Sequence, residues 1–324
     1  MKACIYGAGA IGGWIGHRLA GAGCDVSVVA RGATLKALQH HGLRLNREGV
    51  ISSQAVTSSA LPADLGVQDV IVLAVKAPAL PEVAHHIAPL IGPDTLVMTA
   101  MNGVPWWFLQ GFGGALAGTR LNSVDPDGTI ARAIPAQHII GCVVHASCSL
   151  DAPGLVQHHF GNKLIIGEPS GRQTSRVLAL AAWLEQAGFE ALVTEQIQKD
   201  IWFKLWGNMT VNPISALTGA TTDIIMGDAL LRGFVSSIML EAKEIGARLG
   251  IVIDQQPEDR HAVTLKLGAF KTSMLQDVEA GKAIELDALV TAVRELGGLT
   301  GVATPYTDAL LGLARVHGRV HGLY

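Results

Sequence analysis

Short apolar runs alternate with helical patterns in the first half of the chain. Four of the runs, Lys2–Tyr6, Asp25–Ala30, Asp69–Val75 and Thr95–Met98, are continuous rather than alternating with polar residues. Continuous runs of this length are typical of parallel strands that helices cover on both faces. Between the first two runs, Ile11–Ala22 has a helical pattern that ends at Gly23. Two later segments are predicted to be strands at the far edge of the same sheet: Ile139–Ala146 and Lys163–Gly167.

The pattern changes near Val193, and no strand-like alternation follows it. Glycine and proline separate long helical patterns there, at Glu195–Met209, Leu230–Leu249, Ala262–Ala280, Glu285–Glu295 and Thr307–Val316. A chain of 324 residues has room for about two domains. We therefore predict an α/β protein with an N-terminal Rossmann-type domain, 1–193, built on a mostly parallel sheet. An all-helical C-terminal domain, 194–324, is expected to hold the substrate.

Composition and charge narrow the classes of partner. The chain is 49% hydrophobic and 16% charged, with a net charge of -3 and no basic block. Nucleic acid and anionic membranes are therefore not expected as partners. No uninterrupted apolar run approaches the roughly 18 residues of a membrane span, and we expect a cytoplasmic protein without a signal peptide. The four cysteines form no C-x-x-C pair and the histidine spacings suggest no metal site, so reduced thiols and no bound metal are expected.

The first candidate site is the glycine-rich sequence Gly7-Ala8-Gly9-Ala10-Ile11-Gly12, which has the spacing G-x-G-x-x-G. It directly follows an apolar strand and opens a helix, which is the context of a dinucleotide-binding loop. Gly7 would permit the tight turn, Gly9 would leave room for the pyrophosphate, and Gly12 would let the helix approach the strand. The free N–H groups of the helix N-terminus would bind the phosphates.

The residue after the second strand indicates which dinucleotide binds. An NAD enzyme usually has an acidic residue there to accept a hydrogen bond from the ribose 2′-hydroxyl. This chain has Ala30 and Arg31, and Asp25 lies at the wrong end of the strand. A guanidinium at this position suits a 2′-phosphate, so we predict NADP(H). The alternative is that Arg31 is simply solvated.

A second candidate site lies on the helix predicted after Val193. Lys204, Asn208 and Asn212 are spaced i, i+4 and i+8, so they form one polar stripe on a helix that is otherwise apolar. A buried ammonium and buried amides need polar partners, which a ligand would supply. The alternative is a lysine that reaches water and two amides that cap nearby loops. Pro213 is expected to end or kink the helix.

A third segment is Ser273-Met-Leu-Gln-Asp277, and Glu285 follows its serine by twelve residues. From sequence alone, Glu285 is adequately explained as an acid in the first turn of a helix. Together with Lys76 at a strand end, Asn102-Gly103 and the pattern K-x-x-x-N-x-x-x-N-P, these segments resemble the ketopantoate reductase (2-dehydropantoate 2-reductase) family. The resemblance covers nearly the whole chain, and its motifs occur in the family's order.

The resemblance implies NADPH-dependent reduction of 2-dehydropantoate to pantoate, a step of pantothenate and coenzyme A biosynthesis. It implies that Lys204 is the general acid and that Glu285 contacts the cofactor and sets the environment of the lysine. It also implies a substrate-binding set and a cofactor-binding set, which share Asn102. The substrate set is Asn102, Asn208, Asn212 and Ser273, and the cofactor set is Gly7, Ala8, Gly9, Ala10, Ile11, Gly12, Arg31, Lys76, Asn102, Ser147 and Glu285.

The chain departs from the family's pattern at two places. Trp106 and Trp107 follow Asn102-Gly103, either as packing residues or as residues that reshape the pocket, and Thr222 stands where the family often has an amide. A reductase of a different 2-oxo acid is therefore the first alternative. A non-catalytic NADP-sensing protein is the second. The helical domain has enough apolar residues for a homodimer, although no sequence feature specifies one.

Overall fold

The computed structural model describes the whole chain, residues 1–324. The chain forms two compact units. The first unit comprises Met1–Met101 and Gly128–Ile197, and the second comprises Asn102–Asp127 and Gln198–Tyr324.

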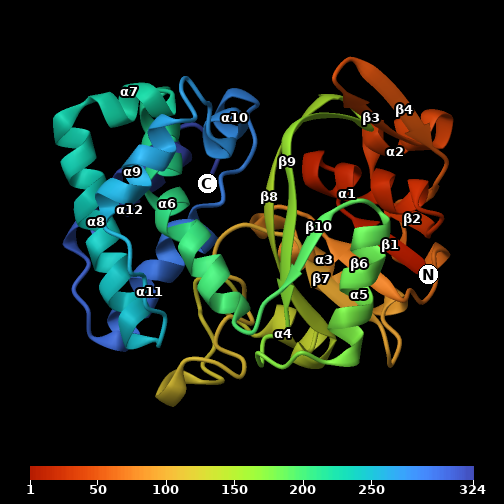
Figure 1. Cartoon of the computed structure of the whole chain (residues 1–324), viewed down its shortest axis with the longest axis horizontal. Coiled ribbons are helices and arrows are strands. Elements are labelled where there is room, and N and C mark those ends of the chain that lie inside the picture. Colours follow the sequence, from red (N-terminus) through yellow and green to blue (C-terminus); the bar gives the residue numbers. More distant parts are fainter. The chain divides into compact units, whose positions relative to one another are not determined.

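A single ten-stranded sheet is the centre of the first unit (Figure 1). Its strands are β1 (Lys2–Tyr6), β2 (Asp25–Val29), β3 (Leu43–Arg47), β4 (Val50–Gln54), β5 (Thr57–Ser59), β6 (Val70–Leu73), β7 (Leu96–Thr99), β8 (Ile139–Ala152), β9 (Leu155–Gly167) and β10 (Glu190–Val193). They lie in the order β4-β3-β9-β8-β7-β6-β1-β2-β5, and β10 also pairs with β9. Only β3 with β4 and β8 with β9 are antiparallel, so the sheet is mostly parallel, as predicted.

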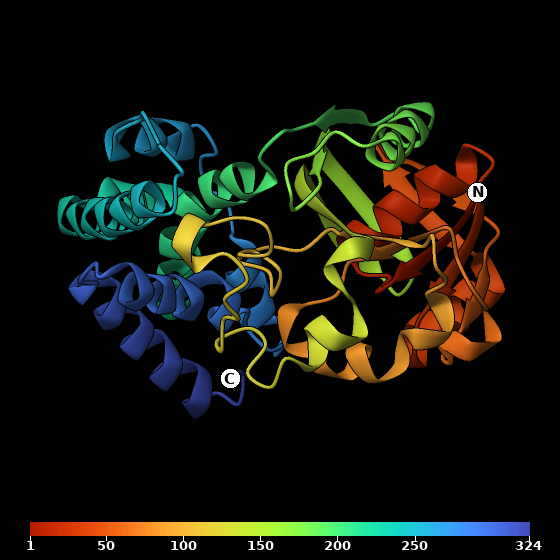
Figure 2. The same ribbon diagram turned by 90° about the horizontal axis from the view of Figure 1, so that it is seen from below.

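Helices cover both faces of this sheet. They are α1 (Ala10–Gly21), α2 (Gly32–His41), α3 (Leu80–His86), α4 (Thr129–Ala133) and α5 (Ser175–Gln186). Figure 2 shows α1 and α5 on one side of the sheet and α3 and α4 on the other. Short 3₁₀ turns connect the elements at Pro62–Asp64, Ala77–Ala79, Ala88–Leu90 and Ala136–His138.

The continuous apolar strands are buried on both faces because their side chains alternate between two layers. Ile5, Val28 and Val72 belong to the core cluster that includes Trp14 of α1. Their neighbours in sequence, such as Ile71, point to the opposite face and are equally buried. The continuous hydrophobic runs therefore predicted the covered parallel strands correctly.

Four strands were not predicted: β3, β4, β5 and β10. Because β3 and β4 were missed, two other strands were given the wrong place in the sheet. β3, β4 and β5 are short, and most residues of β4 are exposed, so no apolar run indicates them. Because β3 pairs with β9 and β4 pairs with β3, the strands β8 and β9 lie inside the sheet. The expectation that Ile139–Ala146 and Lys163–Gly167 form its far edge was wrong.

The second unit is helical, as predicted. Its helices are α6 (Ile197–Thr218), α7 (Thr222–Gly227), α8 (Ala229–Arg248), α9 (Pro257–Leu265), α10 (Ser273–Glu279), a π-helical turn (Asp287–Thr291), α11 (Ala292–Thr300) and α12 (Pro305–Val320), and a 3₁₀ turn lies at Gly114–Leu116. Two buried indoles fix α6 against α8: Trp202 Nε1 donates to the Ala242 carbonyl at 3.2 Å, and Trp206 Nε1 donates to the Met239 carbonyl at 2.7 Å.

Residues 102–127 pack with the helical unit, although the predicted division at 193 placed them with the sheet. The Val104 amide donates to the Ala288 carbonyl at 2.8 Å, and Glu295 accepts from the amides of Asn122 and Ser123. The following residues Trp106, Trp107, Phe108 and Leu109 are buried. This apolar run therefore contributes to the helical core, which explains why an insertion between two strands belongs to the other unit.

Two helix boundaries also differ from expectation. The helix predicted over Ala262–Ala280 is interrupted: Gly268 has a φ of +64°, and the Thr272 hydroxyl caps a new helix by accepting from the Leu275 amide. Pro213 does not end α6, which continues to Thr218. The helix ends where Gly219 adopts a φ of +71°, so this glycine is a better stop signal than the proline.

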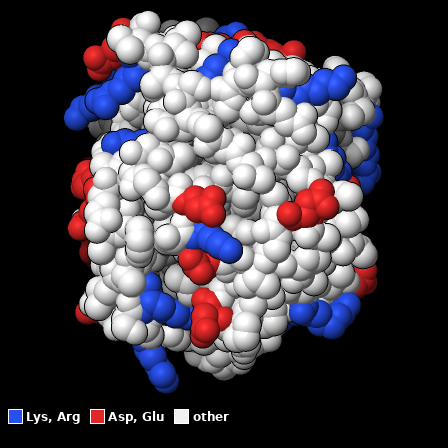
Figure 3. All heavy atoms as spheres, turned by 90° about the vertical axis from the view of Figure 1, so that its right-hand side faces the viewer, with Lys and Arg blue, Asp and Glu red and all other residues white.

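The structure contains no helix that is both long and apolar enough to cross a membrane. On the face drawn in Figure 3, basic and acidic side chains are scattered, and neither sign gathers into a patch. All four cysteines are free thiols.

Candidate active site

Two glycines of the glycine-rich sequence, Gly7 before α1 and Gly12 within it, are required by backbone geometry. Gly7 has a φ of +102°, and a Cβ there would lie 2.8 Å from Val75 Cγ1. A Cβ on Gly12 would lie 2.0 Å from the carbonyl oxygen of Gly7. The tight turn at Gly7 and the close helix approach at Gly12 are therefore as the sequence predicts.

Gly9 differs from both because it faces open space. No atom lies within 4 Å of the position that a Cβ on Gly9 would occupy. Gly9 is the N-cap of α1, no side chain caps this end, and the first turn contains no acidic residue. The N–H groups of Ala10 and Ile11 thus begin a helix at a place where an anion has room and a favourable dipole. These features fit a dinucleotide pyrophosphate.

A pocket of about 310 Å³ adjoins this loop. Gly7, Ala8 and Gly9 form part of its wall, and Arg31 and Glu82 form another part. Arg31 is the N-cap of α2, directly after β2, and its guanidinium donates to the carboxylate of Glu82 on α3. Their side chains are 53% and 54% exposed. The sequence identified Arg31 but not Glu82. Glu82 is 51 residues away in the first turn of α3, and no sequence pattern indicates that the two residues pair.

Tyr6 also lines this pocket. Its hydroxyl is buried and has no hydrogen-bond partner. Burial raises the pKa of Tyr6, and the nearby Arg31 guanidinium partly opposes that rise. The phenol is therefore a neutral donor beside the guanidinium, available to a polar ligand.

Two other predicted cofactor residues lie in the first unit. Lys76 is exposed and follows β6, at the start of the Ala77–Ala79 turn. Ser147 lies in β8, where the pairing with β9 shifts its register. Neither residue lines the pocket of Arg31, and their contact with a cofactor stays a prediction.

The polar stripe of the second unit lies on one continuous helix, α6. One partner of this stripe is Asn102: Lys204 Nζ donates to Asn102 Oδ1 at 2.8 Å. Lys204 and Asn208 are partly exposed, whereas Asn212 is 7% exposed. Residues 102 positions apart in sequence thus meet at the ammonium group. The Asn102 amide oxygen thus helps to orient the ammonium, and an amide cannot take its proton.

Gly103 sets the position of Asn102. Its φ is +83°, and a Cβ there would lie 2.6 Å from the Ala288 carbonyl oxygen. Only glycine allows this close approach between the Asn102 turn and the segment that starts at Glu285. The Asn-Gly pair was noted in the sequence, but the need for the glycine depends on a neighbour far along the chain.

The other predicted residues of the second unit have different surroundings. Glu285 is 6% exposed and directly precedes the helical segment that begins at Leu286. Ser273 is exposed at the first position of α10. Thr222 is buried, and its hydroxyl donates to the Gly268 carbonyl at 2.7 Å. Thr222 stands at the position where the family often has an amide side chain. Its hydroxyl is bonded to the protein's own backbone at Gly268.

The tryptophan pair is a packing feature. Trp106 is 3% and Trp107 is 1% exposed, and neither indole nitrogen has a hydrogen-bond partner. Of the two interpretations of these residues, the structure favours packing over a contact with substrate.

Comparisons with known proteins show which family the whole chain resembles. Residues 3–105 match the family model described as ketopantoate reductase PanE/ApbA, and residues 196–318 match the model of its C-terminal part. A 2-dehydropantoate 2-reductase of Mesorhizobium japonicum is 48% identical over the full length of both chains. A solved structure of a ketopantoate reductase family protein from Ralstonia solanacearum MolK2 is 54% identical, with a TM-score of 0.96 over 100% of this chain and 99% of that chain.

A more distant solved structure is the ternary complex of D-mandelate dehydrogenase with NADH and anilino(oxo)acetate. It has a TM-score of 0.85 at 22% identity, covering 100% of both chains, which shows a shared fold. The predicted α/β fold with a helical second unit is thus confirmed, and so is the prediction of an enzyme. From the family models, the full-length relative and the nearly superimposable structure, this chain belongs to the ketopantoate reductase family of NAD(P)-binding oxidoreductases.

Proposed function

We propose that the protein reduces 2-dehydropantoate to pantoate with NADPH, in pantothenate and coenzyme A biosynthesis. The observation that carries this proposal is the bond of 2.8 Å between Lys204 Nζ and Asn102 Oδ1. It fixes an ammonium group on a largely apolar helix, beside two further amides of the same stripe. Such an arrangement suits a small acid with a carbonyl group.

Lys204 supplies the proton of this reaction. When bound, the nicotinamide cofactor supplies the hydride for the carbonyl carbon. The carbonyl oxygen then develops negative charge, and the ammonium stabilises it and transfers a proton to it. Asn102 holds the ammonium in place, and Asn208, Asn212 and Ser273 bind the hydroxyl and carboxylate groups of the acid. Glu285, which is buried, is proposed to contact the cofactor and to set the environment of the lysine.

NADPH rather than NADH is proposed because of Arg31. A guanidinium binds a phosphate through two parallel hydrogen bonds, and Arg31 lines the pocket next to the glycine loop. In the structure this guanidinium donates to Glu82. Both side chains are half exposed, so the phosphate can replace or share this partner at little cost.

The test is the loss of NADPH absorbance with 2-dehydropantoate in the wild type, in Lys204→Ala and in a control, Lys199→Ala. Lys199 is exposed on the same helix. We expect Lys204→Ala to keep NADPH binding and to lower kcat by roughly 10²-fold or more, which is typical for a lost general acid. The control is expected to match the wild type. Full turnover in Lys204→Ala would overturn the mechanism.

A second candidate is reduction of a different 2-oxo acid by the same mechanism. It is favoured by Thr222, whose hydroxyl bonds to Gly268 rather than facing a ligand. A panel of branched and unbranched 2-oxo acids separates the two candidates. Efficient reduction of another acid, with no turnover of 2-dehydropantoate, would transfer the assignment to that acid and leave the reaction type unchanged.

A further inference from the structure

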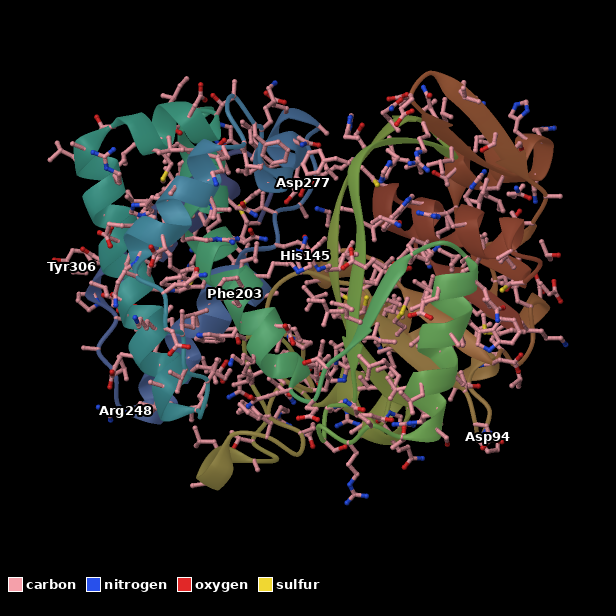
Figure 4. All side chains as sticks on the ribbon, viewed as in Figure 1. Asp94, His145, Phe203, Arg248, Asp277 and Tyr306 are labelled. Carbon is pink, nitrogen blue, oxygen red and sulfur yellow. The ribbon has the colours of Figure 1, made fainter.

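Arg260 lies on α9, and its guanidinium covers one face of α6. Its Cζ lies 5.5 Å from the ring centroid of Phe203, which Figure 4 labels on α6. A Cβ on Gly207 would lie 2.8 Å from Arg260 Nε and 3.1 Å from one terminal nitrogen. The guanidinium therefore rests on the bare backbone of Gly207, and any larger residue there would displace it.

This face of α6 borders the stripe of Lys204 and Asn208. Gly207 comes three residues after Lys204, so the two positions lie roughly 60° apart around the helix, with Cβ sites about 5–6 Å apart. Asn208 follows Gly207 directly. The guanidinium thus rests on a helix position that neighbours Lys204 on the surface of α6.

The charge of Arg260 has no counter-ion in the protein. No acidic side chain forms an ion pair with it, and its Nε is buried without a hydrogen-bond partner. Burial lowers the pKa of Arg260, and no neighbouring carboxylate opposes that effect. Arg260 is partly exposed, and a partly desolvated guanidinium without an ionic partner is stabilised when an anion binds to it. Its planar fork matches a carboxylate, which it binds through two parallel hydrogen bonds.

We propose that Arg260 binds a carboxylate of the 2-oxo acid substrate and orients the acid along the stripe of Lys204 and Asn208. This proposal rests on the proposed function, because it takes Lys204 as the group at the substrate carbonyl. The stacking on Phe203 fixes the plane of the guanidinium. Arg260 is then a substrate-binding residue that the sequence pattern did not indicate, because most arginines on helices are exposed to solvent.

The experiment uses two variants and a control. Arg260→Met keeps an unbranched side chain over Phe203 and Gly207 but removes the charge, and Arg260→Lys keeps a charge without the fork. The control is Arg248→Met, at an exposed arginine that pairs with Glu244. KM and kcat are measured at saturating cofactor for a 2-oxo monocarboxylate and for a 2-oxo dicarboxylate.

We expect Arg260→Met to raise KM roughly 10-fold to 100-fold, the effect of losing a charge-assisted hydrogen bond. The change in kcat is expected to be smaller, the KM for the cofactor and the Tm are expected to stay near the wild type, and Arg260→Lys is expected to be intermediate. An equal rise for both acids assigns Arg260 to the carboxylate beside the carbonyl. A rise for the dicarboxylate alone assigns it to a distal carboxylate.

A KM for both acids that stays within about twofold of the wild type would overturn the proposal. Titration calorimetry with oxalate gives a readout that does not depend on turnover, so it separates this proposal from the proposed function. If the wild type reduces no 2-oxo acid but binds oxalate, and Arg260→Met does not, the proposed function fails and the anion site stands. Equal oxalate affinity in both proteins, including no binding to either, refutes the site.

Discussion

Replacing Glu82 by glutamine is expected to tighten the binding of NADPH and to leave that of NADH unchanged. Glu82 accepts from the Arg31 guanidinium in the pocket beside the glycine loop. A 2′-phosphate bound by Arg31 has to share or displace this carboxylate. Glutamine keeps the shape of the side chain but removes its negative charge. The side chain then competes less with the 2′-phosphate for Arg31, and it no longer repels the phosphate.

The size of the effect follows from exposure. The side chains of Arg31 and Glu82 are 53% and 54% exposed, and an exposed ion pair contributes only about 0.2–1 kcal/mol. Repulsion between the carboxylate and a phosphate at about 5 Å adds roughly 0.5 kcal/mol in salt solution. Together these terms lower the Kd of NADPH roughly threefold to tenfold. Arg31→Gln is expected to raise that Kd roughly 10-fold to 100-fold, because charge-assisted hydrogen bonds are lost.

The assay is the Kd of NADPH and of NADH for the wild type, Glu82→Gln, Arg31→Gln and the double variant. Glu190→Gln is the matched control, because Glu190 forms an exposed ion pair with Lys163 on strands of the same sheet. In the double variant the benefit of Glu82→Gln is expected to shrink, since it depends on Arg31. The reasoning is refuted if Glu82→Gln leaves the ratio of the two Kd values unchanged or shifts it toward NADH.

The remaining predictions concern the second unit. Gly103→Ala is expected to lower kcat roughly 10-fold to 100-fold in a steady-state assay, because a Cβ 2.6 Å from the Ala288 carbonyl oxygen shifts Asn102 away from Lys204; a kcat equal to that of the wild type would contradict this role. Trp107→Ala is expected to reduce the free energy of unfolding by about 3–5 kcal/mol in urea titrations, since the side chain is 1% exposed. A stability within about 1 kcal/mol of the wild type would show that the core closes around the lost ring.

The features predicted well from sequence are those whose cause is local. A glycine loop between a strand and a helix needs only adjacent residues, and its turn at Gly7 formed as expected. The stripe of Lys204, Asn208 and Asn212 depends only on helix periodicity, and α6 is continuous through all three. Continuous apolar runs were likewise sufficient for the covered strands.

The features that were missed depend on contacts between distant residues. The short strand β4 is mostly exposed and exists through its pairing with β3. Residues 102–127 join the helical unit because of buried apolar groups such as Phe108, whose ring centroid lies 5.8 Å from that of Trp202. The ion pair of Arg31 with Glu82 spans 51 positions. Residue type alone identifies none of these partners.

The residues proposed to select the cofactor and those proposed to transfer the proton differ in how strongly the surrounding structure constrains them. Arg31 and Glu82 are half exposed, so a change there costs little stability and can shift the choice of dinucleotide in a single step. Lys204 is held by Asn102, which in turn depends on a glycine with a φ of +83° packed against Ala288. A substitution of Gly103 shifts the backbone at Asn102 and so changes the position of the Lys204 ammonium. We therefore expect cofactor preference to vary easily among such proteins, while the link between Asn102 and Lys204 resists substitution.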